Sequence, residues 1–340
     1  MPLPSLELPA PYLLFLGDLA EPGYAKTGLG LAEWARERCV GELDFAGTQV
    51  STGLPRMTAA QAAAAGARSV VIGVANPGGV IADTWVAPLV EAMAAGLDLV
   101  SGMHGRLADH PAIAAAAERH GVKLHDVRVP PKGIPVGTGE KRSGKRLLTV
   151  GTDCALGKKY TALALARAFA GRGVPSDFRA TGQTGILIAG GGIPIDAVVS
   201  DFVSGAAELL SPAAAADHWD VVEGQGSLFH PSYAAVTLGL IHGSQPDMIV
   251  LCHMPGRTAI LGRPNYPLPA LDAAIEAYLG AARLTNPAVR CAGISLNTAA
   301  LDDEAAAAEI ARVADRYGLP AADPIRGGAE FEALVEACLR

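Results

Sequence analysis

The fold of this chain is decided by one stretch, RLLTVGTDCALGKKYTALALARAF, which runs from Arg146 to Phe169. An apolar strand leads into Gly151, five residues separate it from Gly157–Lys158, and an alanine-rich helix follows. Glycines let backbone N–H groups converge on a phosphate, the helix N-terminus adds partial positive charge, and Lys158 adds a full charge. This order of strand, glycine loop, lysine and helix predicts a phosphate-binding P-loop.

The loop departs from the usual P-loop pattern in two ways. Five residues, not four, lie between its glycines, and Lys159 stands where a Ser or Thr normally contacts Mg²⁺. A second cation at the helix start favours a phosphate-rich ligand held without a metal, such as the pyrophosphate and 3′-phosphate of coenzyme A. No metal ligand is therefore predicted, and ATP with Mg²⁺ is the less favoured cofactor. The predicted cofactor-binding residues are Gly151, Thr152, Asp153, Cys154, Ala155, Leu156, Gly157, Lys158, Lys159 and Tyr160.

Length and composition place the loop in a cytosolic α/β protein. The 340 residues exceed what one hydrophobic core usually serves, and half of them are apolar. The net charge of −7 disfavours a nucleic-acid or anionic-membrane binder. Five scattered cysteines without C-x-x-C spacing fit a reducing compartment, and neither a signal peptide nor a transmembrane run is recognisable. A homo-oligomer is the general expectation for such an enzyme.

Apolar runs alternate with alanine-rich helical stretches along the whole chain, which is typical of doubly wound parallel sheets. The Pro- and Gly-rich stretch Pro130–Lys145 has no hydrophobic period, so we expect an N-terminal Rossmann-like α/β domain over residues 1–137 and a P-loop NTPase-like α/β domain over 138–340. The N-terminal loops Gly17–Gly30 and Val74–Gly79 lack G-x-G-x-x-G spacing and either line a crevice or only turn the chain. Further on, Ala197–Leu210 is predicted to be one helix.

Polar residues follow several predicted strands of the second domain. Because the carboxyl ends of parallel strands line the ligand crevice, Arg179 is a candidate to grip a carboxylate or phosphate. Thr181, Gln183 and Thr184 could bind ligand oxygens, although turn chemistry explains them nearly as well.

Candidates for proton transfer come from two later strands. Glu223 ends the strand HWDVVEG and could accept a proton from a substrate ammonium group. His230 and His253 are the other candidate bases, since neutral imidazole is available near neutral pH. The loop after His253 contributes Arg257 and Arg263, which suit a dicarboxylate, unless the loop is a plain surface crossover. An acyl intermediate on Cys154 is the alternative to direct amine attack, but no histidine is placed beside it by the sequence.

Several segments carry a resemblance to known families. GTDCALGK and DVVEGQGSL are similar to the P-loop and V-E-G-A-G-G segments of dethiobiotin synthetase. PYLLFLGD, VIGVANPGG, DFRATGQTGILIAG, HWDVVEGQGSLFHPSYA and LTNPAVRCAGISLNT, together with the P-loop, resemble the DgcN family over essentially the whole chain. That resemblance implies two domains, an acetyl-CoA-dependent N-acetyltransferase activity on D-glutamate, and a place in D-glutamate catabolism.

Two other functions remain as alternatives. An ATP-dependent kinase or ligase resembling dethiobiotin synthetase would use Lys158 and Glu223 on Mg–ATP, and Lys159 argues against it. A non-catalytic nucleotide sensor would not require polar residues at several strand ends.

Overall fold

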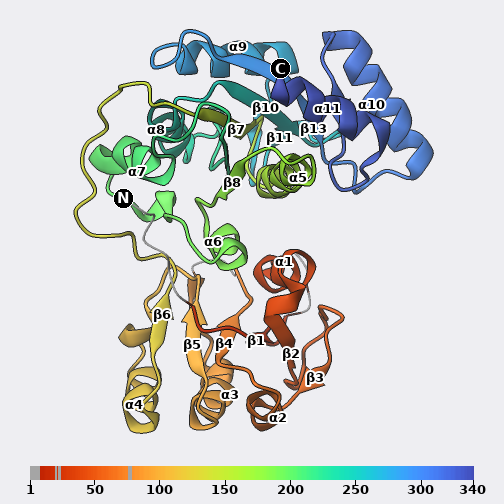
Figure 1. The fold of residues 1–340 in the computed structure, drawn as a ribbon. Helices are drawn as coiled ribbons and strands as arrows, with labels where there is room; N and C mark the ends of the chain where they lie inside the picture. The colour runs from red at the N-terminus through yellow and green to blue at the C-terminus, as the bar shows by residue number, and fades with distance from the viewer. Residues whose placement is uncertain (1–7, 20, 22–23, 76–78) are drawn as a thin grey trace. The chain divides into compact units, whose positions relative to one another are not determined.

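The computed structural model describes residues 8–19, 21, 24–75 and 79–340, and its chain divides into two compact units. The N-terminal unit comprises the chain up to Pro130 together with Gly182–Pro194, and the P-loop unit comprises Pro131–Thr181 and Ile195–Arg340 (Figure 1). Parts of the two N-terminal loops considered above, including Asn76 and Gly78, lie outside the described residues.

A six-stranded parallel sheet forms the centre of the N-terminal unit. Its order is β3-β2-β1-β4-β5-β6, which is the strand order of a Rossmann fold. Apolar β-branched and leucine side chains fill the central strands, so both faces of the sheet are buried. The strands are β1 (Tyr12–Phe15), β2 (Cys39–Leu43), β3 (Arg56–Met57), β4 (Ser69–Ile72), β5 (Asp98–Ser101) and β6 (Leu124–Asp126).

Helices cover both faces of this sheet. α3 packs beside α2 and α4, whereas α1 packs against α6 (Figure 1). Helix α4 ends at Gly121, whose left-handed backbone (φ 67°) makes the expected glycine C-cap. The helices are α1 (Lys26–Trp34), α2 (Ala59–Ala64), α3 (Asp83–Ala94), α4 (Pro111–His120) and α6 (Gln183–Ala189), with short 3₁₀ turns η2 (Arg36–Arg38) and η4 (Leu107–Asp109).

Two of these helices lie where the sequence indicated loops. The stretch Gly17–Gly30 is expected to be a loop that lines a crevice or turns the chain, but its second half forms α1, where Gly28 serves close packing. Its N–H donates to the carbonyl of Gly73 at 2.9 Å, and a Cβ on Gly28 would lie 2.5 Å from Leu16 Cδ2. Helix α6 replaces the turn expected after Thr181. A glycine needed for close packing and a glycine needed for a turn look alike in a sequence.

The P-loop unit contains a second six-stranded parallel sheet, with the order β14-β13-β10-β7-β9-β8. The P-loop strand β7 is central, between β10 and β9. A small antiparallel hairpin, β11 with β12, follows β10. The strands are β7 (Lys145–Gly151), β8 (Ser176–Arg179), β9 (Trp219–Val222), β10 (Met248–His253), β11 (Ala259–Ile260), β12 (Arg263–Pro267), β13 (Arg290–Leu296) and β14 (Ala321–Ala322).

Helices flank this sheet as well. α5 packs beside α11, whereas α7, α8 and α9 follow one another in a second layer (Figure 1). The prediction of a single helix over Ala197–Leu210 is wrong at its start. The α-helix α7 begins only at Val203, and two 3₁₀ turns, η5 (Ile195–Ala197) and η6 (Ser200–Phe202), precede it. The helices are α5 (Lys158–Gly171), α7 (Val203–Leu210), α8 (Ala234–Ser244), α9 (Leu271–Ala282), α10 (Asp303–Tyr317) and α11 (Gly328–Leu339). No described helix has the length and apolar character needed to cross a membrane.

A buried arginine fixes the start of the P-loop strand. Arg146 is fully buried, and its guanidinium donates to the carbonyl oxygens of Arg142, Ser143 and Pro212. Its charge also faces the Asp220 carboxylate at 4.0 Å. A buried guanidinium without hydrogen-bond acceptors would be costly in free energy. Because Arg146 meets several acceptors, this cost is avoided only when the segment before β7 keeps the conformation that supplies them.

Candidate functional site

The P-loop has the backbone conformation that a phosphate cradle requires. Helix α5 begins at Lys158, directly after Gly157. The φ of 105° at Gly157 would cost free energy for a residue with a side chain, whereas glycine adopts it easily. Ala155 is also in the left-handed region, with φ 52°. A non-glycine residue there is uncommon, and such strained positions gather at ligand-binding loops. The predicted strand, loop and helix order is present as expected.

Lys158 lies inside the loop. Its Nζ donates to the carbonyl oxygen of Asp153 at 2.8 Å, and its side chain is only 7% exposed. Burial lowers the Lys158 pKa, while nearby acidic groups including Asp153 and Glu223 act in the opposite direction. The aliphatic part of Lys158 packs against Gly224, where an added Cβ would lie 3.0 Å from Lys158 Cδ and 1.7 Å from the Thr149 carbonyl oxygen. Only glycine fits at that position.

Residues far from the loop in sequence hold its base. Tyr278 of α9 is fully buried, and its hydroxyl donates to the Gly151 carbonyl at 2.7 Å and accepts from Leu228 N at 3.1 Å. Burial raises the pKa of Tyr278 to about 12, so its proton stays in place. Ser227 Oγ donates to the same carbonyl at 2.9 Å. Sequence reasoning missed Tyr278, because nothing separates it from an ordinary core position of an amphipathic helix.

Asp153 is a structural centre of the loop. Its buried carboxylate accepts hydrogen bonds from Cys154 N, from Leu261 N and from Arg257 Nη1, the last at 3.0 Å. Arg257 also donates to the Cys154 carbonyl at 2.9 Å. Arg257, expected as a substrate ligand, is therefore engaged in bracing the P-loop. The bond from Leu261 fastens the β11–β12 hairpin to the same carboxylate.

His230 lies beside the P-loop. One of its ring nitrogens, Cys154 Sγ and an Asp153 carboxylate oxygen all lie within 4.8 Å of one another. His230 Nδ1 accepts from Ser232 N at 3.1 Å, so the neutral ring carries its proton on Nε2. Burial lowers the pKa of His230, which favours this neutral form. The structure thus supplies the histidine neighbour of Cys154 that the sequence could not identify.

His253 also reaches the loop. It ends β10, and its Nδ1 lies 2.9 Å from the hydroxyl of Thr152. Burial lowers the pKa of His253. The imidazole is therefore neutral near pH 7 and holds the first loop residue in position.

Glu223 sits at the carboxyl end of β9, next to the P-loop strand. Its side chain is buried, and Oε2 accepts from the backbone N–H of Thr181 at 2.9 Å. The Thr181 hydroxyl in turn donates to the Glu223 carbonyl at 2.8 Å, and Gln225 Nε2 donates to that hydroxyl at 3.2 Å. Glu223 and Thr181 are brought together as the sequence analysis expected for strand ends.

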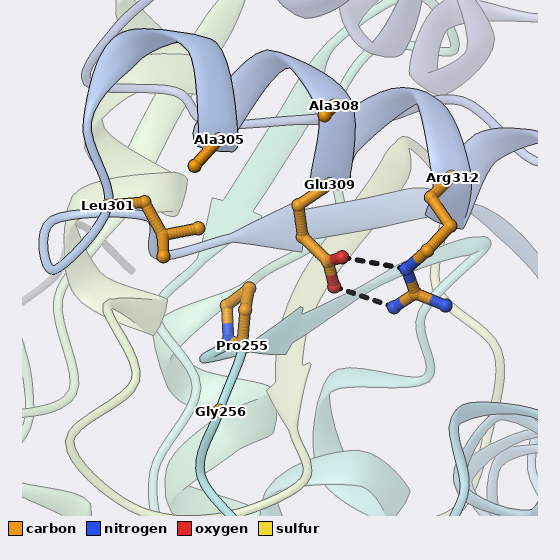
Figure 2. Close-up of a pocket in the computed structure, with 7 residues that line it drawn as sticks. All are labelled: Pro255, Gly256, Leu301, Ala305, Ala308, Glu309 and Arg312. Atoms are coloured by element: carbon orange, nitrogen blue, oxygen red, sulfur yellow. Dashed lines mark hydrogen bonds and ion pairs between the residues drawn. The ribbon is translucent and has the colours of Figure 1, made fainter.

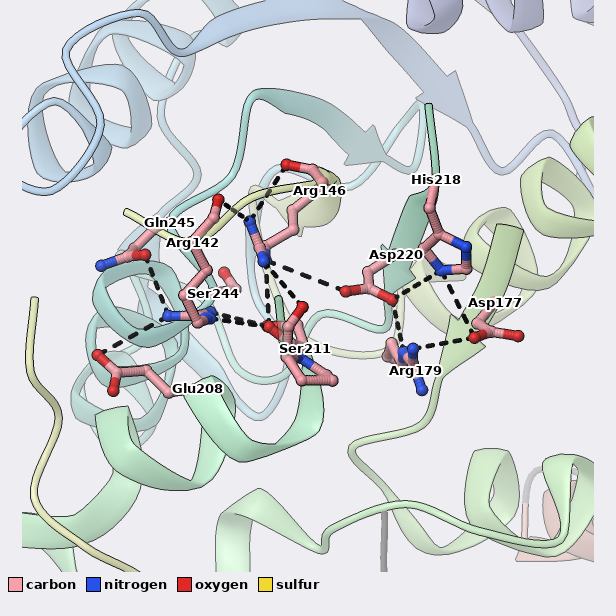
Figure 3. Close-up of polar contacts among 12 residues, drawn as sticks. Arg142, Arg146, Asp177, Arg179, Glu208, Ser211, His218, Asp220, Ser244 and Gln245 are labelled. Carbon is pink, nitrogen blue, oxygen red and sulfur yellow. Dashed lines mark hydrogen bonds and ion pairs between the residues drawn. The ribbon is translucent and has the colours of Figure 1, made fainter. Parts of the chain in front are cut away.

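Arg179 does not join this group. Its Nε donates to Asp220 at 2.6 Å and its Nη2 to Asp177 at 2.9 Å (Figure 3). Asp177 and Asp220 are the second residues of β8 and β9 and pair in register. The guanidinium is therefore directed toward the amino ends of the strands, away from the end where Glu223 lies. This ion pairing argues against the expectation that Arg179 grips a ligand at the carboxyl edge, and that role stays a prediction.

The other candidates occupy different surroundings. Gln183 and Thr184 belong to the N-terminal unit, where Gln183 accepts from Arg128 and the Thr184 hydroxyl lies 2.9 Å from that of Thr27. Thr181 belongs to the P-loop unit, although it is only two residues from Gln183. A sequence pattern does not show that the chain passes from one unit to the other at this point. Arg263 begins the exposed strand β12 of the hairpin, and its charge contributes to lowering the pKa of His230.

Lys159 and Tyr160 open the P-loop helix. The Nζ of Lys159 lies 4.3 Å from the centre of the Tyr160 ring, a cation–π distance. A lysine thus stands where a magnesium-binding hydroxyl is usual.

Two groups of potential metal ligands occur among the described residues. In each group a different arginine forms an ion pair with the carboxylates. Arg257 binds Asp153 in the cluster with Cys154 and His230. Arg179 binds both carboxylates in the cluster of Asp177, His218 and Asp220. Because a guanidinium competes with a cation for the same carboxylate oxygens, neither cluster is assigned as a metal site.

Comparison with known proteins agrees with this architecture. Residues 43–130 match the Rossmann-like domain of unknown function DUF1611_N, and residues 135–335 match the P-loop domain of unknown function DUF1611_C. A crystal structure of a DUF1611 family protein from Anabaena variabilis aligns with a TM-score of 0.84 and 36% identity, covering 96% of this chain and 99% of that one. The predicted pairing of a Rossmann-like with a P-loop α/β fold is confirmed.

Curated relatives extend over the whole chain. A D-glutamate N-acetyltransferase of Tritonibacter scottomollicae is 50% identical over 94% of this chain and 96% of its own length. A D-glutamate N-acetyltransferase of a Pseudoalteromonas species is 46% identical over 96% of this chain and 98% of its own. The resemblance recognised in the sequence is thereby confirmed. With both of its domains matched and relatives similar along nearly their full length, the chain belongs to the DUF1611 family.

Proposed function

We propose that this protein is a D-glutamate N-acetyltransferase that uses acetyl-CoA as the acetyl donor. The observation that carries the proposal is the 50% identity to a D-glutamate N-acetyltransferase over 94% of the chain, combined with a P-loop of phosphate-binding geometry. Acetyl transfer to the amino group forms an amide N–C bond, breaks the thioester C–S bond and releases free coenzyme A.

The P-loop would bind the pyrophosphate of the coenzyme. Backbone N–H groups at the start of α5 and the Lys158 ammonium provide the positive charge, and Tyr278 and Ser227 keep the loop rigid. The His230 Nε2–H is a further donor for a phosphate oxygen, because its Nδ1 is already occupied. Lys159 in place of a magnesium-binding hydroxyl supports coenzyme A over Mg–ATP.

Glu223 is the proposed general base. The base must present an acceptor lone pair to the α-ammonium of the substrate. In its neutral form His230 presents an N–H on Nε2, and His253 is held by Thr152. Glu223 would offer a carboxylate oxygen as the acceptor, and the bond from Thr181 N orients its side chain at the carboxyl end of β9.

Arg263 is the proposed carboxylate ligand. It lies exposed on a hairpin that Asp153 fastens to the P-loop, whereas Arg179 and Arg257 are engaged in ion pairs. Its planar fork suits a carboxylate of the acceptor.

We favour direct attack of the amine over an acyl intermediate on Cys154. Cys154 belongs to the loop assigned to the pyrophosphate, and the pantetheine arm separates the thioester from that group. Replacing Cys154 with alanine should therefore preserve turnover. Loss of turnover, together with an acetylated wild-type protein trapped in the absence of D-glutamate, would support the cysteine route assisted by His230.

The proposal is tested by incubating the purified protein with acetyl-CoA and D-glutamate, while measuring thiol release and N-acetylglutamate. L-Glutamate and D-aspartate serve as comparison acceptors. Transfer should persist in excess chelator and without ATP. ADP formation that depends on Mg²⁺ would instead indicate the kinase or ligase alternative, and binding without turnover of any acceptor would indicate a nucleotide sensor. Light scattering of the same sample tests the expected homo-oligomer.

Glu223→Gln separates chemistry from binding. The amide keeps the shape and the contact region but cannot take the proton, so kcat should fall by roughly 10²–10⁴ while the acetyl-CoA dissociation constant changes little. Wild-type turnover in this variant would transfer the role of base to His230 or His253.

A further inference from the structure

A pocket of about 470 Å³ lies between the chain that follows β10 and the first turns of helix α10 (Figure 2). Pro255 and Gly256 form one wall. Leu301, Ala305 and Ala308 form the opposite wall, and Glu309 and Arg312 lie at its polar end. All of these residues belong to the P-loop unit.

The chain segment that forms one wall of the pocket is tied to the phosphate cradle at both of its ends. The wall Pro255–Gly256 lies in the chain between His253, which contacts Thr152, and Arg257, which binds Asp153. Both contacts are to P-loop residues, so this wall is held against the loop from its two sides. In coenzyme A the adenine ring is joined to the pyrophosphate through one ribose, so it lies close to any phosphate that the loop holds.

The lining suits a flat, largely apolar ring. The volume lies within the range of about 300–1,000 Å³ that is usual for small-molecule sites. Proline and the small side chains of Ala305 and Ala308 leave room for a planar group between the two walls. The apolar lining would contact the faces of such a ring, and the polar end would contact its edge.

That polar end carries an oriented carboxylate. Arg312 donates to Glu309 through two bonds, Nε to Oε2 at 2.7 Å and Nη2 to Oε1 at 2.6 Å (Figure 2). These hydrogen bonds lower the pKa of Glu309 and keep it ionised. An ionised carboxylate accepts hydrogen bonds from an exocyclic amino group and repels a keto oxygen.

We propose that this pocket binds the adenine ring of the coenzyme, with the ring between Pro255 and the Ala305–Ala308 face and its 6-amino group donating to Glu309. The inference rests on the proposed function, in that the coenzyme is acetyl-CoA. The pyrophosphate occupies the P-loop, the adenine is anchored on the α10 side, and the pantetheine arm leaves the loop in another direction.

The pocket is tested first by filling it. Ala308→Trp should raise the calorimetric dissociation constant for acetyl-CoA at least about tenfold, because the indole would occupy the pocket. Ala307→Trp is the matched control, because Ala307 is an exposed neighbour on the same helix that does not line the pocket. Unchanged acetyl-CoA affinity in folded Ala308→Trp would overturn the assignment.

The second test changes the ligand and needs no bulky substitution. Acetyl-1,N⁶-etheno-CoA lacks the 6-amino donor, so wild-type protein should bind it about tenfold more weakly than acetyl-CoA, the value of one charge-assisted hydrogen bond. In Glu309→Ala the two ligands should bind alike. Equal discrimination in both proteins would refute the contact with Glu309.

The inference and the proposed function fail in different ways. Wild-type protein that binds acetyl-CoA but acetylates no amino acid would refute the function and leave the pocket assignment standing. The pocket alone would be refuted if the wild-type protein were active, if Ala308→Trp bound acetyl-CoA as tightly as wild type, and if the etheno analogue bound wild-type protein as tightly as acetyl-CoA. Wild-type protein that does not bind acetyl-CoA at all would refute both.

Discussion

The hydroxyl of Tyr278 lies 2.7 Å from the carbonyl oxygen of Gly151, so a helix more than a hundred residues away holds the end of the P-loop strand. The same hydroxyl accepts from Leu228 N, in the segment that follows Glu223. One buried side chain therefore connects the phosphate loop with the segment that carries the proposed base. The geometry of the site depends on this connection as much as on the loop sequence.

Tyr278→Phe should keep the packing of the ring and remove the hydroxyl that bonds to Gly151 and Leu228. Leu228 N loses its acceptor and Gly151 keeps only Ser227 as a side-chain donor, so the free energy of unfolding should fall by about 1–3 kcal/mol. Coenzyme binding should weaken as the loop loosens. Urea unfolding and calorimetry measure both effects. Tyr266→Phe, on the exposed strand β12, is the control expected to match wild type.

Gly224→Ala should prevent the P-loop from forming. The new methyl group would lie 1.7 Å from the Thr149 carbonyl, a clash that only backbone displacement relieves. We expect a loss of about 3 kcal/mol or more in stability, at the severe end for single substitutions. Gly280→Ala, in α9 with open space at its Cβ, should be neutral or stabilising by up to about 1 kcal/mol. Thermal melts that rank the two variants alike would contradict the packing argument.

Lys158→Ala should weaken acetyl-CoA binding by at least about tenfold, because one charge-assisted phosphate contact is worth about 1.5–3 kcal/mol. Lys145→Ala removes a lysine at the opposite end of the same strand and should leave binding unchanged. Calorimetric titration of both folded variants provides the measurement. If the two bound the coenzyme equally well, the phosphate assignment of the loop would be lost.

Arg179→Met should affect stability and not substrate capture. Asp220 is buried and loses its bond of 2.6 Å, although Arg146 remains at 4.0 Å, so unfolding should become about 1–3 kcal/mol easier. The KM for D-glutamate should stay near wild type. Arg283→Met, which breaks an exposed pair with Glu276, should cost less than about 1 kcal/mol. A raised KM without destabilisation would restore Arg179 to the substrate site.

The half-buried imidazole of His253 should make stability depend on pH below neutrality. Burial lowers its pKa in the folded protein, whereas the unfolded chain has the ordinary value of 6.5. As the pH falls through 6.5, the unfolded state binds more protons and stability decreases. His253→Asn should flatten this decrease between pH 7.5 and 5.5 in chemical unfolding experiments. An unaltered slope would show that other groups, such as His230, dominate.

Much of the fold could be read from local patterns. The P-loop was identifiable because strand, glycines, lysine and helix are contiguous, and each element has a local physical cause. Helices α1 and α6 were not identified, because glycines such as Gly28 serve close packing there and carry no local sign of it. Strand order predicted that the residues after β8 and β9 lie together, as Thr181 and Glu223 do, but it did not show that the Arg179 side chain turns to Asp177 and Asp220.

By itself, the sequence determined the two α/β units, the phosphate loop and the absence of a hydroxyl after Lys158, since propensity, period and charge act over a few residues. The tertiary structure decided which partner each charged or polar side chain takes. Arg257 binds Asp153, Arg179 binds Asp220, and His230 lies beside Cys154. Such partnerships join residues up to about a hundred positions apart, and they depend on burial and distance, which only the packing of strands and helices sets.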